Sequence, residues 1–207
     1  MMSVFEPRPD GKGARLALDP IESSILRSLA VQLLELIGPG PGAAADPLAD
    51  PADVDPFEAL TAALAEGPTE PPADPALARL FPDAYGGPDT GPGADPEELR
   101  ARSSEFRRYT ENDLRARKRE DSLAVVRALD ALDAGPGEAV LELEPAECLR
   151  WLGALNDLRL TLASRLEIED DEDGGLLYRL PDSDPRKPMV MAYLWLGGLQ
   201  ETLIETL

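Results

Sequence analysis

The sequence has 207 residues and a formal net charge of −20, from 40 acidic and 20 basic residues, and it contains no histidine. The missing histidine excludes a Ser-His-Asp triad, a Cys-His pair and HExxH zinc chemistry built from these residues, and the charge disfavours a nucleic acid partner. The single cysteine, Cys148, cannot form an intramolecular disulfide, which is typical of a reducing cytoplasm. We therefore expect a cytoplasmic protein without enzymatic activity, bound cofactor or bound metal.

The first part of the chain predicts a strand followed by a helix. The segment ARLAL at 14–18 has strand composition, and residues 20–37 carry isoleucine and leucine at intervals of four and end before Gly38. The helix begins with DPIE at 19–22, in which Asp takes the N-cap, Pro the first helical position and Glu the third. Similar signatures recur as DPFE at 55–58, DPEE at 95–98 and, more weakly, EPAE at 144–147.

Residues 38–96 hold 13 of the 21 prolines and 8 of the 17 glycines, a composition that offers little apolar surface to bury. We predict flexible linkers at 38–55 and 84–95. Between these linkers we expect a short helix near 56–66 and a single helical turn at 75–81. The turn carries three apolar side chains that we expect to pack on the core: Leu77, Leu80 and Phe81.

Residues 97–134 contain neither glycine nor proline, and they predict one helix of about 57 Å at about 1.5 Å per residue. Within this stretch, TEND at 110–113 places Thr110 and Asp113 at the spacing of a second capping box. Two helices that are broken at this point are therefore the alternative.

The last third of the chain predicts one strand and two helices. The segment AVLEL at 139–143 has strand composition, with 14–18 and 176–180 as its possible partners. Helices are expected at 145–166 and 188–206, because both segments carry apolar residues at helical spacing.

These elements predict a mainly α fold. We expect a single compact helical domain over residues 1–207, with a minor short β element and long linkers rich in proline and glycine. The most apolar run, MVMAYLWLGGL at 189–199, has about half of the roughly 20 residues that a bilayer span requires, so no membrane association is expected. A homo-oligomer is compatible with this fold.

Cations gather on the first half of the long helix, in FRRYTENDLRARKRE at 106–120. On a helical wheel five of these cations and the preceding Arg100 span about 120°, and the six form a candidate docking face for a protein partner: Arg100, Arg107, Arg108, Arg115, Lys118 and Arg119. The alternative is structural, with the cations bound to the protein's own carboxylates. Three favourable i,i+4 pairs, each worth about 0.2–0.5 kcal/mol, support it: Glu98–Arg102, Glu111–Arg115 and Asp113–Arg117.

Arg159 lies on the apolar stripe of the 145–166 helix, three residues after Asn156. A buried guanidinium without a partner costs several kcal/mol, so we predict a buried ion pair at Arg159 and Asn156, with a carboxylate from residues 97–121. The alternative is an arginine that anchors a ligand.

Two further features favour structural interpretations. The acidic run EIEDDEDGG at 167–175 departs from a calcium-binding EF-hand loop, because Leu180 stands where a bidentate Glu is required, and we expect a solvated loop. Cys148 lies among leucines without a histidine or a second cysteine nearby, so we expect an inert core thiol.

Four blocks of the sequence resemble an actinobacterial family of unknown function. They are LDPIESSILRSLAVQLLELI at 18–37, ALARLFPDAY at 76–85, FRRYTENDLRARK at 106–118 and LRWLGALNDLRLTLASRL at 149–166. The resemblance covers most of the chain outside the predicted linkers. It implies no assigned activity, but members of the family are commonly encoded beside the adaptor of the Clp protease, which suggests a link to regulated proteolysis.

We therefore predict a non-enzymatic, cytoplasmic interaction or regulatory protein with an unidentified protein partner. The alternative is a winged-helix-like, DNA-binding transcriptional regulator whose arginine-rich helix enters a groove. The overall charge of the chain argues against DNA binding, and the local charge of residues 106–120 argues for it.

Overall fold

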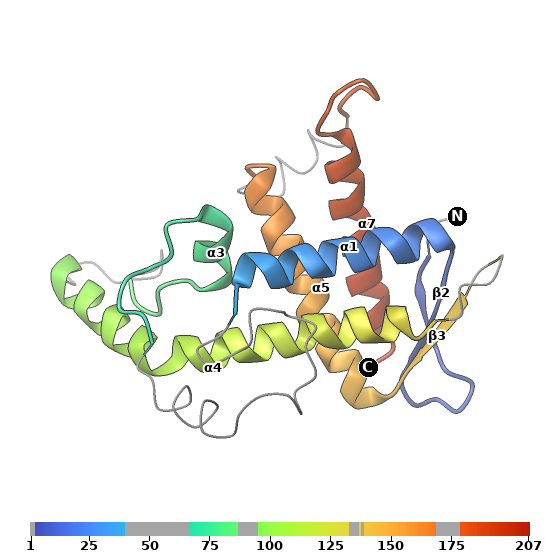
Figure 1. Ribbon diagram of the computed structural model, residues 1–207, viewed down its shortest axis with the longest axis horizontal. Coiled ribbons are helices and arrows are strands. Elements are labelled where there is room, and N and C mark those ends of the chain that lie inside the picture. Colours follow the sequence, from blue (N-terminus) through green and yellow to red (C-terminus); the bar gives the residue numbers. More distant parts are fainter. Residues whose placement is uncertain (1–2, 40–66, 87–94, 133–136, 138, 169–178) are drawn as a thin grey trace. The chain divides into compact units, whose positions relative to one another are not determined.

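The computed structural model describes residues 3–39, 67–86, 95–132, 137, 139–168 and 179–207 (Figure 1). The chain divides into two compact units, of which unit 1 holds residues 1–33 and 120–207 and unit 2 holds residues 34–119. The boundaries fall inside two helices, α1 (Pro20–Ile37) and α4 (Pro96–Asp130).

Unit 1 contains a three-stranded antiparallel sheet in the order β1 (Phe5–Pro7), β2 (Ala14–Leu18), β3 (Ala139–Leu143). The predicted pairing of 14–18 with 139–143 is confirmed, with Leu16 opposite Leu141. Alternate side chains of these strands point into the core, as expected for a sheet with one solvated face. The other predicted partner, 176–180, lies mostly outside the described residues. The neighbour of β2 on its other side is β1, which the sequence analysis did not predict.

Gly13 is required where β1 and β2 are joined. Its φ of +84° lies in the left-handed region, and a Cβ atom at this position would stand 2.0 Å from the carbonyl oxygen of Leu143. Only glycine satisfies both conditions, because every other residue has a Cβ atom. The close approach brings β2 and the end of β3 into register.

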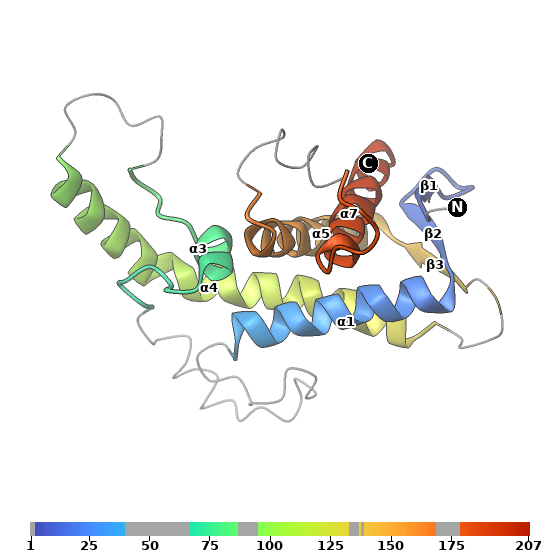
Figure 2. The same ribbon diagram turned by 90° about the horizontal axis from the view of Figure 1, so that it is seen from above.

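Two helices of unit 1, α5 (Pro145–Arg165) and α7 (Lys187–Glu205), lie side by side in both views (Figures 1 and 2). Their bounds agree closely with the predicted helices at 145–166 and 188–206. Trp151 of α5 is buried against Phe5 of β1, with ring centroids 6.0 Å apart in an edge-to-face arrangement. The backbone N–H of Phe5 also donates to Thr202 Oγ1 of α7 at 3.1 Å. These contacts place the inner face of the sheet on α5 and α7.

The predicted helix starts at 19, 95 and 144 are confirmed. Asp19 Oδ1 accepts the backbone N–H groups of Ile21 and Glu22 at 2.7 and 2.8 Å, and Glu22 reaches back to the N–H of Asp19 at 3.1 Å. At the start of α4, Asp95 Oδ1 accepts the backbone N–H of Glu97. At the start of α5, Glu144 and Glu147 form a capping box, in which each side chain accepts the backbone N–H of the other residue. The start predicted at 55 lies outside the described residues.

The long α4 is continuous over 35 residues, so the alternative of two helices is wrong. Thr110, which would have capped a second helix, instead donates its hydroxyl to the carbonyl oxygen of Phe106, one turn earlier, at 2.8 Å. A threonine that bonds back to the preceding turn does not cap a new one. The helix begins one residue before the predicted start and ends four residues before the predicted end.

The mainly α fold with a minor antiparallel sheet is confirmed. Within the described ranges, no helix is long and apolar enough to cross a membrane. The predicted helix at 56–66 and most of the predicted linkers at 38–55 and 84–95 lie outside those ranges. The extent of one domain over residues 1–207 stays a prediction.

Candidate functional site

In unit 2, the arginines of α4 contact two other segments, namely residues 67–86 and the last turn of α1. Residues 67–86 contain the short helix α3 (Pro75–Leu80), whose Leu80 is buried together with Phe81, as predicted for this turn, whereas Leu77 is only half-buried. Asp74 caps α3 by accepting the N–H groups of Ala76 and Leu77, so α3 begins at the predicted residue 75 with a cap that was not predicted.

Arg107 connects α4 to residues 81–83 and is only 4% exposed. Its Nη2 donates to the carbonyl oxygen of Phe81 at 3.0 Å and to Asp83 Oδ1 at 2.8 Å, and its Nη1 donates to Glu111. Burial opposes the charge of this guanidinium, but the hydrogen bonds to Asp83 and Glu111 outweigh burial and raise the pKa of Arg107. The buried arginine is therefore charged, and both of its terminal nitrogens are bound within its own unit, whereas its buried Nε has no hydrogen-bond partner.

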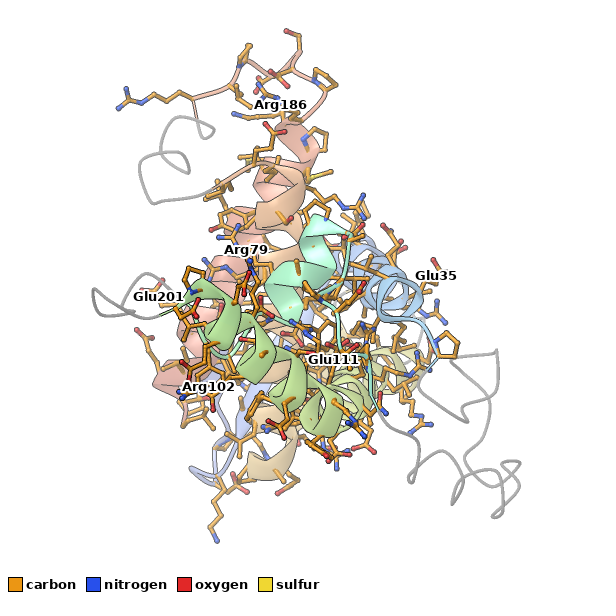
Figure 3. All side chains as sticks on the ribbon, turned by 90° about the vertical axis from the view of Figure 1, so that its left-hand side faces the viewer. Glu35, Arg79, Arg102, Glu111, Arg186 and Glu201 are labelled. Carbon is orange, nitrogen blue, oxygen red and sulfur yellow. The ribbon has the colours of Figure 1, made fainter. Side chains whose placement is uncertain are left out.

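Glu111 lies between two arginines and is 3% exposed. Besides Arg107 it binds Arg115, whose Nε and Nη2 lie 2.9 and 2.7 Å from Glu111 Oε1. Arg115 also donates to the carbonyl oxygen of Ile37 at 2.9 Å and stacks on Phe81, with 4.3 Å between the guanidinium carbon and the ring centroid. In Figure 3 the labelled Glu111 lies among the side chains beside the 67–86 segment.

Arg119 is buried at the C-terminal end of α1. Its Nη1 donates to the carbonyl oxygens of Leu34 and Gly38. Burial lowers the pKa of Arg119, while the carbonyls at a helix C-terminus carry partial negative charge that favours a cation. Gly38, with a φ of +77°, ends α1 in the left-handed conformation that is usual for a helix C-terminus.

The prediction that six cations form an exposed docking face is therefore wrong for three of them. Arg107 and Arg119 are buried and Arg115 is largely covered, because their long side chains reach acceptors on α1 and on residues 67–86. This is the structural alternative, in which the arginines bind groups of their own chain. Arg100 is exposed, and the remaining two cations, Arg108 and Lys118, are half-buried and already have partners.

A patch of three exposed aromatic rings lies next to these arginines on α4. Tyr85, Phe106 and Tyr109 are 43%, 48% and 65% exposed, and we call them the aromatic patch. The rings of Tyr85 and Phe106 meet edge to face, with centroids 6.2 Å apart and planes at 88°. A hollow of about 280 Å³ is lined by Tyr85, Arg102, Glu105, Phe106, Tyr109 and Thr110. In Figure 3 the labelled Arg102 lies at the outer edge of α4.

The backbone of Tyr85 is held on α4 by Ser103, a buried serine. The hydroxyl of Ser103 accepts the N–H of Tyr85 and donates to its carbonyl oxygen, both at 3.1 Å. Tyr85 and Phe106 of the aromatic patch are therefore held together before any partner binds. This patch was not predicted from the sequence, although Phe106 and Tyr109 stand three residues apart on one helix of a chain with 5% aromatic residues.

Arg159 of α5 does not form the predicted buried ion pair. It is half-buried, its Nη1 donates to Gln200 Oε1 of α7 at 2.6 Å, and its guanidinium carbon lies 5.2 Å from the ring centroid of Tyr193. Part of the side chain still reaches water, so a neutral amide and an aromatic ring suffice as partners. Asn156 is exposed and makes no part of this contact.

Cys148 is fully buried, which agrees with the predicted core thiol. Burial raises the pKa of this thiol and keeps it protonated, whereas the thiolate is the form that reacts with oxidants and disulfides. Among the described residues no group of three or more His, Cys, Asp or Glu side chains could hold a metal ion.

We expect Cys148 in the folded protein to react with a disulfide reagent at least about 1,000-fold more slowly than in the unfolded chain, because reaction requires opening of the core. The two rates are measured from the absorbance released by dithiobis-nitrobenzoate, once in buffer and once in about 6 M guanidinium, which unfolds the chain. Reaction at similar rates in the two conditions would show that the thiol is accessible.

A family model described as "Domain of unknown function (DUF2017)" matches residues 2–207. The chain belongs to this family. Among curated relatives, the "Oxidative stress regulator AosR" of Mycobacterium tuberculosis (strain ATCC 25618 / H37Rv) is 31% identical over 201 residues, covering 96% of this chain and 84% of the relative. The "Putative oxidative stress regulator AosR" of Mycobacterium leprae (strain TN) is 34% identical with the same coverage. No solved structure matches the chain.

The predicted resemblance to a family of unknown function is thus confirmed as membership of DUF2017. Two of the blocks that carried the resemblance, 76–85 and 106–118, meet at the aromatic patch and at Arg107 of this DUF2017 chain. The association with the gene of a Clp protease adaptor stays a prediction.

Proposed function

We propose that this chain is a non-enzymatic regulatory protein that acts by binding a protein partner through the aromatic patch. The observation that carries the proposal is the exposure of three rings, two of which, Tyr85 and Phe106, are already held in place by Ser103 and by their edge-to-face contact. Tyrosine and phenylalanine bury large areas at interfaces and lose little conformational entropy when their rings are already fixed.

The names of the relatives support a regulatory role in the response to oxidative stress. Within these 207 residues an intramolecular disulfide is excluded by the single cysteine, and burial of Cys148 disfavours direct oxidation. We therefore propose that the oxidative signal reaches this chain through its partner. The names do not mention proteolysis, so the link to regulated proteolysis has no support from them.

The alternative of a DNA-binding regulator is weaker. Phosphate contacts need exposed cations, and Arg107 and Arg119 are buried while Arg115 is mostly covered by its own chain. The formal net charge of −20 adds repulsion from DNA. A protein partner fits the exposed rings better than a polyanion does.

The double variant Phe106→Glu/Tyr109→Glu should lose the partner while keeping the fold, because both side chains are substantially exposed. We expect affinity to fall by about 30-fold or more, since truncated hot-spot residues cost about 2 kcal/mol or more. Affinity capture from lysates of oxidant-treated cells, quantified by mass spectrometry, identifies the partner, and titration with that purified partner measures the affinity.

The matched control is Leu149→Glu, which replaces an apolar side chain of similar exposure on α5. It should capture the same proteins as the unchanged chain, and all variants should show unchanged thermal melts. If the double variant captures the same proteins with the same affinity, the aromatic patch is not the binding site.

A further inference from the structure

The hollow at the aromatic patch has a lining suited to an organic cation. Besides Thr110 it contains the three rings of the patch and two charged side chains, Arg102 and Glu105. The face of an aromatic ring carries partial negative charge, and aromatic cages bind ammonium groups in proteins for this reason. The rings and the carboxylate of Glu105 are therefore the groups of the hollow that attract a cation.

Two rings of the patch form walls at a right angle. The planes of Tyr85 and Phe106 meet at 88°, so a compact group in the corner between them faces both rings. Tyr109 stands three residues after Phe106 on the same helix face and adds a third ring. A planar guanidinium stacks flat on one ring, whereas a compact ammonium group can contact perpendicular walls. This geometry favours a lysine over an arginine.

Glu105 leaves the hollow with an unpaired negative charge. It is exposed, and its carboxylate has no hydrogen bond or ion pair among the described residues. Arg102 is bound by Glu98 at 2.5 Å, and this pair is neutral as a whole. An apolar occupant would remove water from Glu105 without replacing it, whereas an ammonium group would bind the carboxylate. The charges of the hollow therefore select a cation over an apolar side chain.

One ring of the patch already contacts a cation of its own chain. The guanidinium carbon of Arg108 lies 5.5 Å from the ring centroid of Tyr109, within the range of a cation–π contact. Arg108 is half-buried and has a further partner in the chain, which holds it there. Tyr109 is nevertheless 65% exposed, so most of its surface remains open to solvent. A second cation can therefore approach the rings from the solvent side.

The size of the hollow indicates a side chain of a protein as the source of the cation. Its volume of about 280 Å³ lies below the roughly 300–1,000 Å³ of pockets that enclose small-molecule ligands. The net charge of −20 attracts a basic partner over longer distances. We propose that the aromatic patch binds a lysine of the protein partner, with the ammonium group between the rings and on Glu105. This inference rests on the proposed function, because it names the chemistry of the partner at the same patch.

NMR titration with n-butylammonium chloride, which reproduces the lysine side chain, tests the proposal. The neutral probe is 1-butanol, which has the same carbon chain and a hydroxyl in place of the ammonium group. Both titrations are run at constant ionic strength on chain with labelled ring carbons, in which four phenylalanines and four tyrosines give signals. We expect n-butylammonium to shift the signals of the aromatic patch and to bind at least about fivefold more tightly than 1-butanol.

Two variants separate the effect of charge from that of apolar area. Glu105→Gln should weaken binding of n-butylammonium by at least about twofold and leave 1-butanol unchanged. Phe106→Leu should also weaken n-butylammonium by at least about twofold, because leucine is apolar but has no aromatic face. The matched control is Glu97→Gln, which removes an exposed acid of the same helix that does not line the hollow. It should leave both affinities unchanged, and thermal melts confirm that the variants fold.

Equal affinities for n-butylammonium and 1-butanol would overturn the lysine site. Equal losses in Glu105→Gln and Glu97→Gln would also overturn it, because the net charge of the chain would then explain the binding. In both cases the proposed function still stands if Phe106→Glu/Tyr109→Glu loses the protein partner. If that double variant keeps the partner at full affinity, the proposed function fails, and the assignment of the lysine to the partner fails with it even where n-butylammonium binds.

Discussion

Glu111→Gln should lower the free energy of unfolding by about 3–5 kcal/mol, the cost of removing one partner of a buried charge network. The neutral amide keeps the size of the side chain but leaves Arg107 and Arg115 facing each other without the carboxylate that joins them. Arg107 would retain Asp83, whose side chain is 44% exposed and therefore offers a weaker, more hydrated charge. Chemical denaturation followed by circular dichroism gives the free energy.

Glu98→Gln is the matched control, because it removes the acid of another i,i+4 pair on the same helix. Glu98 and Arg102 are 59% and 58% exposed, and pairs of this type are worth less than about 1 kcal/mol. We expect a loss of about 0.5 kcal/mol or less for this control. Equal losses in the two variants would mean that Glu111 is as hydrated as Glu98 and that the arginines are not held by it.

Gly13→Ala should destabilise unit 1 by about 2–5 kcal/mol. A non-glycine residue in the left-handed region costs about 1–2 kcal/mol, and relief of a 2.0 Å overlap with the carbonyl oxygen of Leu143 adds strain of about 1–3 kcal/mol. The methyl group cannot turn away, because Cβ is fixed to the backbone. Either β2 or the end of β3 must move, and the register between them is disturbed.

Gly11→Ala separates the two contributions. Gly11 has a φ of +70° in the same turn, but a Cβ atom there would meet nothing within 4 Å. The free energy of unfolding of this control should therefore fall only by the cost of the left-handed backbone conformation, about 1 kcal/mol. Denaturation curves for both variants, and hydrogen exchange of the β2 amides in Gly13→Ala, measure the difference. If the two variants lose the same free energy, the contact between Gly13 and Leu143 does not constrain the sheet.

The elements of the fold depend mainly on local signals, and for that reason the sequence predicted them. The N-caps at Asp19, Asp95 and Glu144 satisfy backbone N–H groups within three residues of themselves. Helical and strand periodicity are also local, so α1, α5, α7 and the strands β2 and β3 were predictable, whereas the choice between 14–18 and 176–180 as partner of β3 was not. The short β1 was missed because three residues, one of them proline, carry almost no periodicity.

Which cations of α4 are buried depends on residues that are far away in the sequence. The wheel of α4 showed a cationic arc, but the carbonyl of Ile37 that binds Arg115 is 78 residues away, and that of Gly38 is 81 residues from Arg119. The local pattern of charges on α4 does not show whether distant carbonyl groups will pack against these arginines. It therefore could not distinguish an exposed docking face from arginines that bind groups of their own chain. Arg159 is a similar case, because its partner Gln200 comes from another helix.

The sequence by itself determined the mainly α class, most helix bounds, the strands β2 and β3 and the inert environment of Cys148. Only the tertiary structure decided which arginines are buried and how Ser103 holds Tyr85 beside Phe106. The physical reason is the range of the forces involved. Capping and periodicity act over three or four residues, whereas burial of a charge or exposure of a ring depends on every segment that packs around it.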